Sequence, residues 1–167
     1  LYISNNNAAN AYTTSSTSVV HAYRDVQMPA LVGDLSLSFD WKAVGESSFD
    51  YLRVWAVPAT YIPVPGTQIV PGPGRVQLGA NFNNSAAWQT PNFIFPATAF
   101  SGQTMRLVFE WRNDSSGGTQ PPAAVDNINL SQLTCPAPIN LLATSNTNNS
   151  NLELSWTPVG AETQWEI

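Results

Sequence analysis

Few side chains in this chain can perform covalent or acid–base chemistry. The sequence has one histidine, His21, and one cysteine, Cys135. His21 lies in an alternating run, residues 19–23, that is typical of an ordinary strand. For Cys135, a disulfide to another part of a longer parent protein is favoured over a role as a thiol nucleophile. No motif of a serine hydrolase, zinc peptidase, P-loop ATPase or dinucleotide-binding fold occurs, and no pair of carboxylates is singled out for glycoside hydrolysis. The sequence therefore predicts a protein that is not an enzyme.

Charge and hydropathy argue against two further classes of partner, nucleic acids and the membrane interior. Lys and Arg number 6 against 11 Asp and Glu residues, for a formal net charge of −5. The basic residues are scattered, so the footprint that holds a phosphate backbone is missing and nucleic-acid binding is not expected. No apolar run approaches the roughly 20 residues that span a bilayer, so membrane insertion is not expected. Scarce Lys and Glu beside abundant Asn, Ser and Thr favour a secreted β protein whose export signal has already been removed.

Period-two alternation between clusters of Gly, Pro and Asn predicts an all-β fold. The Pro- and Gly-rich segments 58–74 and 113–122 are expected to be long connections. Leu, Phe and Trp at alternate positions of two strands predict core residues, with the intervening charges outside. These inward residues are Leu37, Phe39, Trp41, Leu107, Phe109 and Trp111. The expected strands are 1–4, 19–28, 35–44, 51–57, 75–82, 92–95, 104–113 and 125–133. Eight such strands suit a two-sheet sandwich.

A change in composition after residue 133 marks the expected domain boundary, with one domain at 1–134 and another at 135–167. The second segment is similar to the first three strands of a fibronectin type III domain, with Trp156 as the core tryptophan of the second strand. Such a domain needs about 100 residues. We therefore expect only its truncated beginning here, and a parent protein that continues past Ile167.

Five segments of the first domain resemble one known family. They are LYISNN at 1–6, AYRDV at 22–26, LSFDWK at 37–42, DYLRV at 50–54 and AVDNI at 124–128. In this order they look like the MAM-like, cleaved-adhesin-type jelly-roll modules of secreted Bacteroidota proteins. The resemblance implies a two-sheet jelly roll. Such modules often precede fibronectin type III repeats in surface proteins exported by the type IX system, so it also implies a secreted or cell-surface protein with secretion machinery among its partners.

In a jelly roll the strand at 51–57 lies antiparallel to the strand at 104–113, so acidic loops converge at one end of the sandwich. Carboxylates gathered there repel one another unless a cation or an arginine compensates, and Ca²⁺ takes about six to eight oxygen ligands of this kind. We expect a structural Ca²⁺ site that uses Asp126 with some of Glu46, Asp50 and Asp114. The alternative is that Asp126 is a buried carboxylate satisfied by backbone amides or by Arg24.

The same strand pairing places aromatic and charged residues together on the outer face of one sheet. Aromatic rings beside planar arginine donors suit sugar rings or polypeptide. The candidate ligand-binding residues are Tyr23, Tyr51, Arg53, Trp55, Arg75, Glu110 and Arg112. The alternative is that Arg53 and Glu110 form a cross-strand pair beneath a neighbouring domain or a loop such as 58–74.

The leading hypothesis is a non-catalytic module of a secreted or cell-surface protein that binds a glycan or a surface protein. One alternative is a structural stalk or secretion-cargo domain without a ligand, whose outward aromatic residues pack against neighbouring domains of the same polypeptide. Another is an accessory domain of a secreted peptidase or glycosidase. Fold alone does not decide among them, and glycan binding would distinguish the first two.

Overall fold

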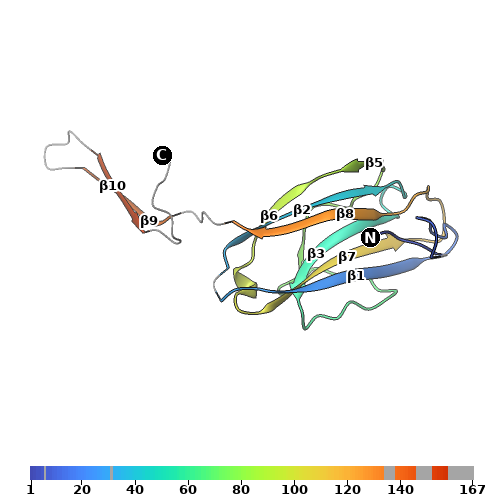
Figure 1. Ribbon diagram of the computed structural model, residues 1–167, viewed down its shortest axis with the longest axis horizontal. Coiled ribbons are helices and arrows are strands. Elements are labelled where there is room, and N and C mark those ends of the chain that lie inside the picture. Colours follow the sequence, from blue (N-terminus) through green and yellow to red (C-terminus); the bar gives the residue numbers. More distant parts are fainter. Residues whose placement is uncertain (6, 31, 134–137, 146–151, 158–167) are drawn as a thin grey trace. The chain divides into compact units, whose positions relative to one another are not determined.

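The computed structural model describes residues 1–5, 7–30, 32–133, 138–145 and 152–157. The chain is all-β and divides into two compact units, Leu1–Ser131 and Gln132–Ile167. The first unit is a sandwich of two antiparallel sheets (Figure 1). The second contains a two-stranded antiparallel sheet of β9 (Ile139–Ser145) and β10 (Leu152–Thr157). The described residues include no candidate membrane-spanning helix.

The first sheet of the sandwich has the strand order β1-β7-β3-β4. Its strands are β1 (Ser18–Gln27), β7 (Thr104–Asn113), β3 (Tyr51–Pro58) and β4 (Val76–Gln77). The register sets Tyr51 opposite Arg112, so the start of β3 meets the end of β7. This confirms the antiparallel pairing expected from the jelly-roll order.

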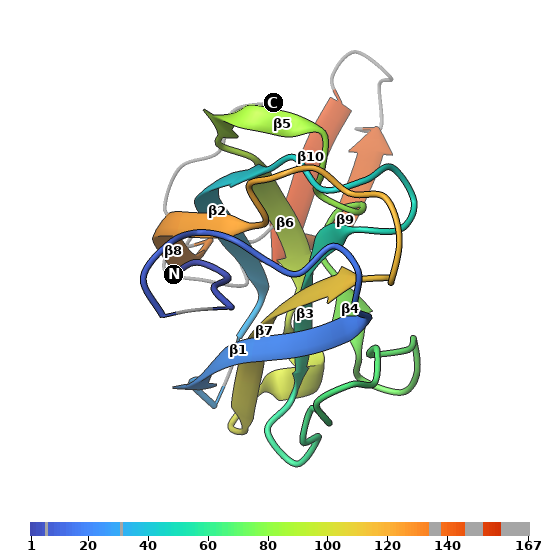
Figure 2. The ribbon, with the colours of Figure 1, turned by 90° about the vertical axis from the view of Figure 1, so that its right-hand side faces the viewer.

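The second sheet is built around β2 (Asp34–Ala43). Consecutive halves of β2 pair with β6 (Asn92–Pro96) and β5 (Ser85–Gln89), and β8 (Ala124–Gln132) also pairs with β2. Tyr2 adds a bridge to Ala124 at the start of β8. We count this N-terminal segment as the first strand, and β5 and β6 together as one interrupted strand. On this count the two sheets have the strand order of a jelly roll. The short helix η1 (Thr98–Phe100) leads to β7. Figure 2 shows the two sheets as separate layers.

Side chains alternate across β2 as a half-buried strand requires, whereas β7 is buried on both faces, with residues 105–111 all buried. Every second residue of β2 is buried, and Leu37 and Phe39 have no exposed surface. Phe39 stands edge-on to Phe82 and to Phe109, with both centroid distances at 5.6 Å, a favourable arrangement for aromatic rings. The six predicted core residues are all buried, which confirms that prediction.

A second, smaller core lies on the outer side of the first sheet. The segment 59–75, between β3 and β4, runs beyond this sheet (Figure 1). Ile69 of this segment is buried against Trp55, Val57 and Val108. Exposed fractions of 1% for Ile69 and 0% for the other three show that the contact excludes water. The segment expected to be a loop therefore acts as a cover for the sheet.

Three strand predictions need correction. The edge strand Ser85–Gln89 was not expected, because most of its residues are exposed and it lacks an alternating apolar pattern. The strand expected at 75–82 is reduced to Val76–Gln77, and Gly79 beyond it has a φ of 78° that a strand does not contain. Residues 1–4 contribute isolated bridges instead of a regular strand. Cys135, the 134/135 boundary and the third fibronectin-like strand lie outside the described residues.

Candidate functional site

Three carboxylates gather at one end of the sandwich. Glu46 lies in the turn between β2 and β3, Asp50 directly precedes β3, and Asp114 directly follows β7. One carboxylate oxygen from each residue lies within 4.8 Å of the other two. The β3–β7 pairing brings these loops together, as the strand order predicted. The cluster can hold a metal ion.

Asp50 is held from two sides and is only 1% exposed. Its Oδ2 accepts a hydrogen bond from the Tyr12 hydroxyl at 2.6 Å, and its Oδ1 accepts one from the Asp114 amide at 3.0 Å. Burial, the hydrogen bond to Asp50 and the nearby negative charges raise the pKa of the Tyr12 phenol well above its usual range. The phenol therefore stays protonated and keeps the Asp50 carboxylate in one orientation.

The residues present fit an oxygen-coordinating cation. Glu46 Oε2 is buried and has no hydrogen-bond partner among the described residues. A Cβ atom at Gly117 would lie 2.3 Å from this oxygen, so the turn closes tightly over the Glu46 carboxylate. None of the ion pairs in the described part of the chain involves the three carboxylates. Oxygen ligands of one Ca²⁺ ion lie about 2.3–2.6 Å from it and so at most about 5.2 Å from one another, and the three carboxylate oxygens, all within 4.8 Å of one another, meet this limit.

The fourth predicted ligand, Asp126, is not part of this cluster. It is exposed on β8, where its Oδ1 accepts the Asn127 amide at 2.9 Å. Asn127 has a φ of 48°, so the regular alternation of the strand is interrupted beside Asp126. The expected position of Asp126 beside the other three carboxylates is therefore wrong. The alternative of a buried Asp126 held by Arg24 is wrong as well, because Asp126 is exposed.

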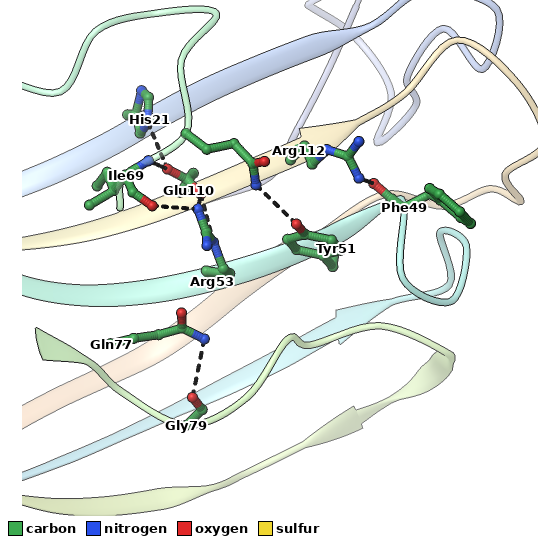
Figure 3. A network of polar contacts seen from close by, with 10 residues as sticks. His21, Phe49, Tyr51, Arg53, Ile69, Gln77, Gly79, Glu110 and Arg112 are labelled. Atoms are coloured by element: carbon green, nitrogen blue, oxygen red, sulfur yellow. Dashed lines mark hydrogen bonds and ion pairs between the residues drawn. The ribbon is translucent and has the colours of Figure 1, made fainter. Parts of the chain in front are cut away.

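A buried carboxylate organises the outer face of the first sheet (Figure 3). Glu110 of β7 has no exposed surface. Its Oε1 accepts Arg53 Nε at 2.8 Å, and its Oε2 accepts the Ile69 amide at 2.6 Å and lies 3.1 Å from His21 Nε2. Arg53 Nη2 donates to Glu110 Oε1 and, at 2.8 Å, to the Ile69 carbonyl. The ion pair therefore binds both backbone polar groups of one residue in the covering segment.

The pKa of Glu110 reflects two opposing effects. Burial alone raises the pKa of a carboxyl group, because it disfavours the charged form. Hydrogen bonds from His21, the Ile69 amide and Arg53 outweigh this effect and hold the pKa of Glu110 below its usual value. The side chain therefore stays ionised beneath the covering segment.

Three of the seven predicted ligand-binding residues are buried on this outer face. Trp55 and Glu110 are 0% exposed and Tyr51 is 8% exposed, because segment 59–75 lies over them. The expectation that these three side chains are open to solvent is wrong. The Arg53–Glu110 pair beneath a loop, the alternative considered from the sequence, is the arrangement found.

The remaining members of the predicted set differ in exposure. Arg112 Nη1 donates to the Phe49 carbonyl at 2.7 Å, and the Arg75 guanidinium lies 5.0 Å from the Tyr61 ring centroid. Both arginines are only partly exposed. Tyr23 is 52% exposed and is the most accessible of the set. A ligand-binding role for these residues stays a prediction.

A groove on the second sheet was missed by the sequence reasoning. Tyr2 and Trp88 are 49% and 48% exposed, and both line a hollow of about 290 Å³ together with Lys42 and Asp126. Lys42 Nζ lies 4.9 Å from the Trp88 ring centroid. The outward position of Lys42 followed from alternation along β2, but Trp88 belongs to the strand that was not expected. The groove therefore combines two accessible rings, one amine and one carboxylate.

A larger cleft of about 420 Å³ lies between the N-terminal segment and β1. Core residues Leu52, Phe109 and Trp111 line it, together with neutral polar residues such as Ser18. None of the side chains that line it is Asp, Glu, Lys or Arg. The cleft therefore lacks the combination of amine and carboxylate that the groove offers.

No family model matches the chain, and no curated protein matches it. The resemblance to MAM-like and cleaved-adhesin modules therefore stays a prediction. Among solved structures, the chain is similar to a family 61 carbohydrate-binding module in complex with β-1,4-galactotriose, with a TM-score of 0.41 and 10% sequence identity over 71% of this chain. The match spans 66% of that chain, just under two thirds of its length.

Proposed function

We propose that this chain is a non-catalytic carbohydrate-binding module and that its ligand lies in the groove of Tyr2, Lys42, Trp88 and Asp126. The observation that carries the proposal is the Trp88 ring, which is 48% exposed with the Lys42 amine 4.9 Å from its centroid. A sugar ring has an apolar face and a hydroxyl-bearing edge. An accessible aromatic ring beside a few polar groups complements both features.

The composition of the groove supports the same ligand class. Tyr2 offers a second aromatic ring, 49% exposed, in the same hollow. The Lys42 amine can only donate hydrogen bonds, and the Asp126 carboxylate can only accept them. A sugar hydroxyl does both, so one pyranose can contact both side chains while it stacks on an aromatic ring.

A glycan array probed with the full chain tests the proposal, followed by titration calorimetry of the best ligand. We expect Trp88→Ala to weaken binding at least about tenfold, since a stacked aromatic ring contributes on the order of 1.5 kcal/mol. Tyr23→Ala is the matched control, because Tyr23 is 52% exposed on the other sheet. Loss of binding in Tyr23→Ala alone would place the ligand on the first sheet. Binding to no glycan would favour the structural stalk.

We further propose that Glu46, Asp50 and Asp114 hold a structural Ca²⁺ ion. The buried, unpartnered oxygen of Glu46 and the three converging carboxylates support this assignment. Oxygen ligands of this type favour hard cations, and Ca²⁺ accepts irregular loop geometry more readily than Mg²⁺. When bound, the ion would neutralise the repulsion among the carboxylates and join the turn before β3 to the loop after β7.

We propose that the module works outside the cell, as part of a secreted or cell-surface protein. The composition and the resemblance to exported jelly-roll modules support this location. Adhesion to a glycan-bearing surface, with neighbouring domains of the same polypeptide as spacers, is the corresponding role. Fractionation of the native organism with an antibody to the chain tests it, and recovery of the protein only from the cytoplasm would contradict it.

A further inference from the structure

The larger cleft lies at one side of the sandwich, between an edge of the first sheet and the N-terminal segment (Figure 2). β1 is the edge strand of the first sheet. The N-terminal segment is attached to the start of β8 by the Tyr2–Ala124 bridge, and the Ile3 amide donates to the Ala123 carbonyl at 3.0 Å. The volume of about 420 Å³ falls within the range of about 300–1,000 Å³ that is usual for ligand pockets. The cleft is therefore large enough for a small molecule.

The inner wall of the cleft belongs to the main core. The register of β1 and β7 sets Val20 opposite Trp111 and Ala22 opposite Phe109, so these side chains share the inner face of the first sheet. Leu52, Phe109 and Trp111 are at most 7% exposed, whereas Val20 is 40% exposed. A molecule in the cleft would therefore lie against apolar and aromatic side chains of the core.

The polar side chains of the inner wall already have partners within the protein. The Ser18 hydroxyl donates to Asn113 Oδ1, and the Tyr12 hydroxyl donates to a carboxylate of the acidic cluster at 2.6 Å. The polar side chains at the rim are exposed and reach water: Asn5, Thr13 and Ser16. The inner part of the cleft therefore offers a ligand apolar surface with few unused hydrogen-bonding groups.

The titratable groups at the cleft are also engaged. His21 lies on the opposite face of β1 from Val20, and its Nε2 lies 3.1 Å from Glu110 Oε2. The Leu1 ammonium donates to the Val125 carbonyl at 2.9 Å. None of the described residues that line the cleft has an Asp, Glu, Lys or Arg side chain. A charged group placed there would lose its hydration without gaining a side-chain counter-ion.

We propose that this cleft binds an uncharged apolar molecule of roughly two or three rings. An apolar cavity of about 150 Å³ is enough for benzene, so about 420 Å³ suits a ligand two to three times as large. Burial of its apolar surface would drive binding, and the rings of Tyr12, Phe109 and Trp111 offer aromatic contacts. Trp88 and Lys42 do not line the cleft, so this site does not depend on the proposed carbohydrate-binding function.

Fluorescence titration of the full chain with N-phenyl-1-naphthylamine tests the proposal. This probe is uncharged and apolar, and its emission rises in apolar surroundings. The matched charged probe is 8-anilinonaphthalene-1-sulfonate, which has the same rings and a sulfonate group. We expect saturable binding of the neutral probe, at least about fivefold tighter than that of the sulfonate, because the sulfonate would lose its hydration in the cleft. Tighter binding of the sulfonate, or no saturable binding of the neutral probe, would overturn the proposal.

Filling the cleft gives the local test. We expect Val20→Trp to weaken binding of the neutral probe at least about tenfold, because the larger side chain occupies the space that the probe needs. Val76→Trp is the matched control, since Val76 is a strand valine of similar exposure, 38% against 40%, and lies outside the cleft. Equal weakening in both variants would overturn the proposal.

A second variant covers the case in which Val20→Trp does not fold. Ser16 is exposed at the rim, so Ser16→Trp can narrow the cleft without altering a strand. Circular dichroism checks the fold of each variant. We expect Ser16→Trp to weaken binding of the neutral probe as well, and unchanged binding in every folded cleft variant would overturn the proposal.

The exposed ring of Trp88 is the other place for an apolar probe to bind. We expect Trp88→Ala to change binding of the neutral probe by less than about twofold, since Trp88 lines the groove and not the cleft. Loss of the probe in Trp88→Ala, with binding retained in Val20→Trp, would place the probe in the groove and overturn the cleft site.

Discussion

The carboxylate of Glu110 accepts the backbone amide of Ile69 at 2.6 Å, so a buried residue of β7 fixes the segment that crosses the outer face of its sheet. Arg53 completes the attachment by donating to the Ile69 carbonyl at 2.8 Å. The aromatic face that the sequence marked as a ligand surface is therefore a second, small core. The groove around Trp88 is the site that we propose for the ligand.

Shortening Ile69 should weaken this second core. We expect Ile69→Ala to lower the free energy of unfolding by about 2–5 kcal/mol, because Ile69 is 1% exposed among Trp55, Val57 and Val108. Ile62→Ala is the control in the same segment, and since Ile62 is 69% exposed its effect should stay within about 0.5 kcal/mol. Urea denaturation measures both. Equal effects would show that segment 59–75 does not pack on the sheet.

Removing the charge of Glu110 should cost more than removing an exposed charge. We expect Glu110→Gln to destabilise the fold by about 3–5 kcal/mol, because Arg53 would keep a largely buried charge without its partner. Asp34→Asn is the control, since Asp34 is exposed at the start of β2 and belongs to none of the ion pairs in the described part of the chain, and it should change stability by no more than about 0.5 kcal/mol. Hydrogen exchange of the Ile69 amide should accelerate only in Glu110→Gln. An unchanged rate there would contradict the attachment.

Lowering the pH should weaken the attachment of Ile69 to the Glu110 carboxylate. The folded state holds the pKa of Glu110 below the usual value, so the unfolded state binds a proton first as the pH falls. The stabilisation is complete above the unfolded pKa of about 4.3 and is lost as the pH falls through the lower folded value. We expect denaturation curves of the wild type to show this loss and those of Glu110→Gln to show less of it. Parallel pH profiles for the two proteins would rule out this contribution.

Calcium should raise the melting temperature, and EDTA should reverse the rise. A ligand at about 100 times its Kd adds about 2.7 kcal/mol to the free energy of unfolding. Gly117→Ala should reduce the calcium effect, because the new Cβ would lie 2.3 Å from Glu46 Oε2.

Gly66→Ala is the control for the calcium experiment. Gly66 has a φ of +80° and Gly117 one of +68°, so both substitutions strain the backbone, but nothing lies within 4 Å of a Cβ at Gly66. We expect Gly66→Ala to keep the calcium effect. A wild-type melt that neither calcium nor EDTA changes would remove the metal site.

The sequence could predict those features of the fold that depend on the alternation of apolar and polar residues along a strand. Leu37 and Phe39, like Leu107 and Phe109, stand at every second position of two long strands, and such a pattern has one consistent placement in a sandwich. The jelly-roll order, which the family resemblance implied, then predicted that the acidic loops lie together. Alternation does not reveal what covers the outer face of a sheet, so the burial of Trp55 was missed.

The remaining differences between the predicted and the observed structure come from one backbone position, Asn127, and from the edge strand β5. The positive φ of Asn127 interrupts the alternation of β8, and Asp126 faces solvent as a result. The edge strand that carries Trp88 has little apolar surface to bury, so its sequence gives no strand signal. The groove residues come from the N-terminal segment, β2, β5 and β8, and only the strand order brings them together.

The most direct test of the carbohydrate-binding site is a titration of the ¹⁵N-labelled full chain with the best neutral oligosaccharide, followed through its indole N–H signals. Trp88 is 48% exposed in the groove and Trp55 is 0% exposed beneath segment 59–75. We expect a saturable shift of the Trp88 indole signal with the Trp55 signal unchanged. A shift of Trp55 while Trp88 stays in place would contradict it.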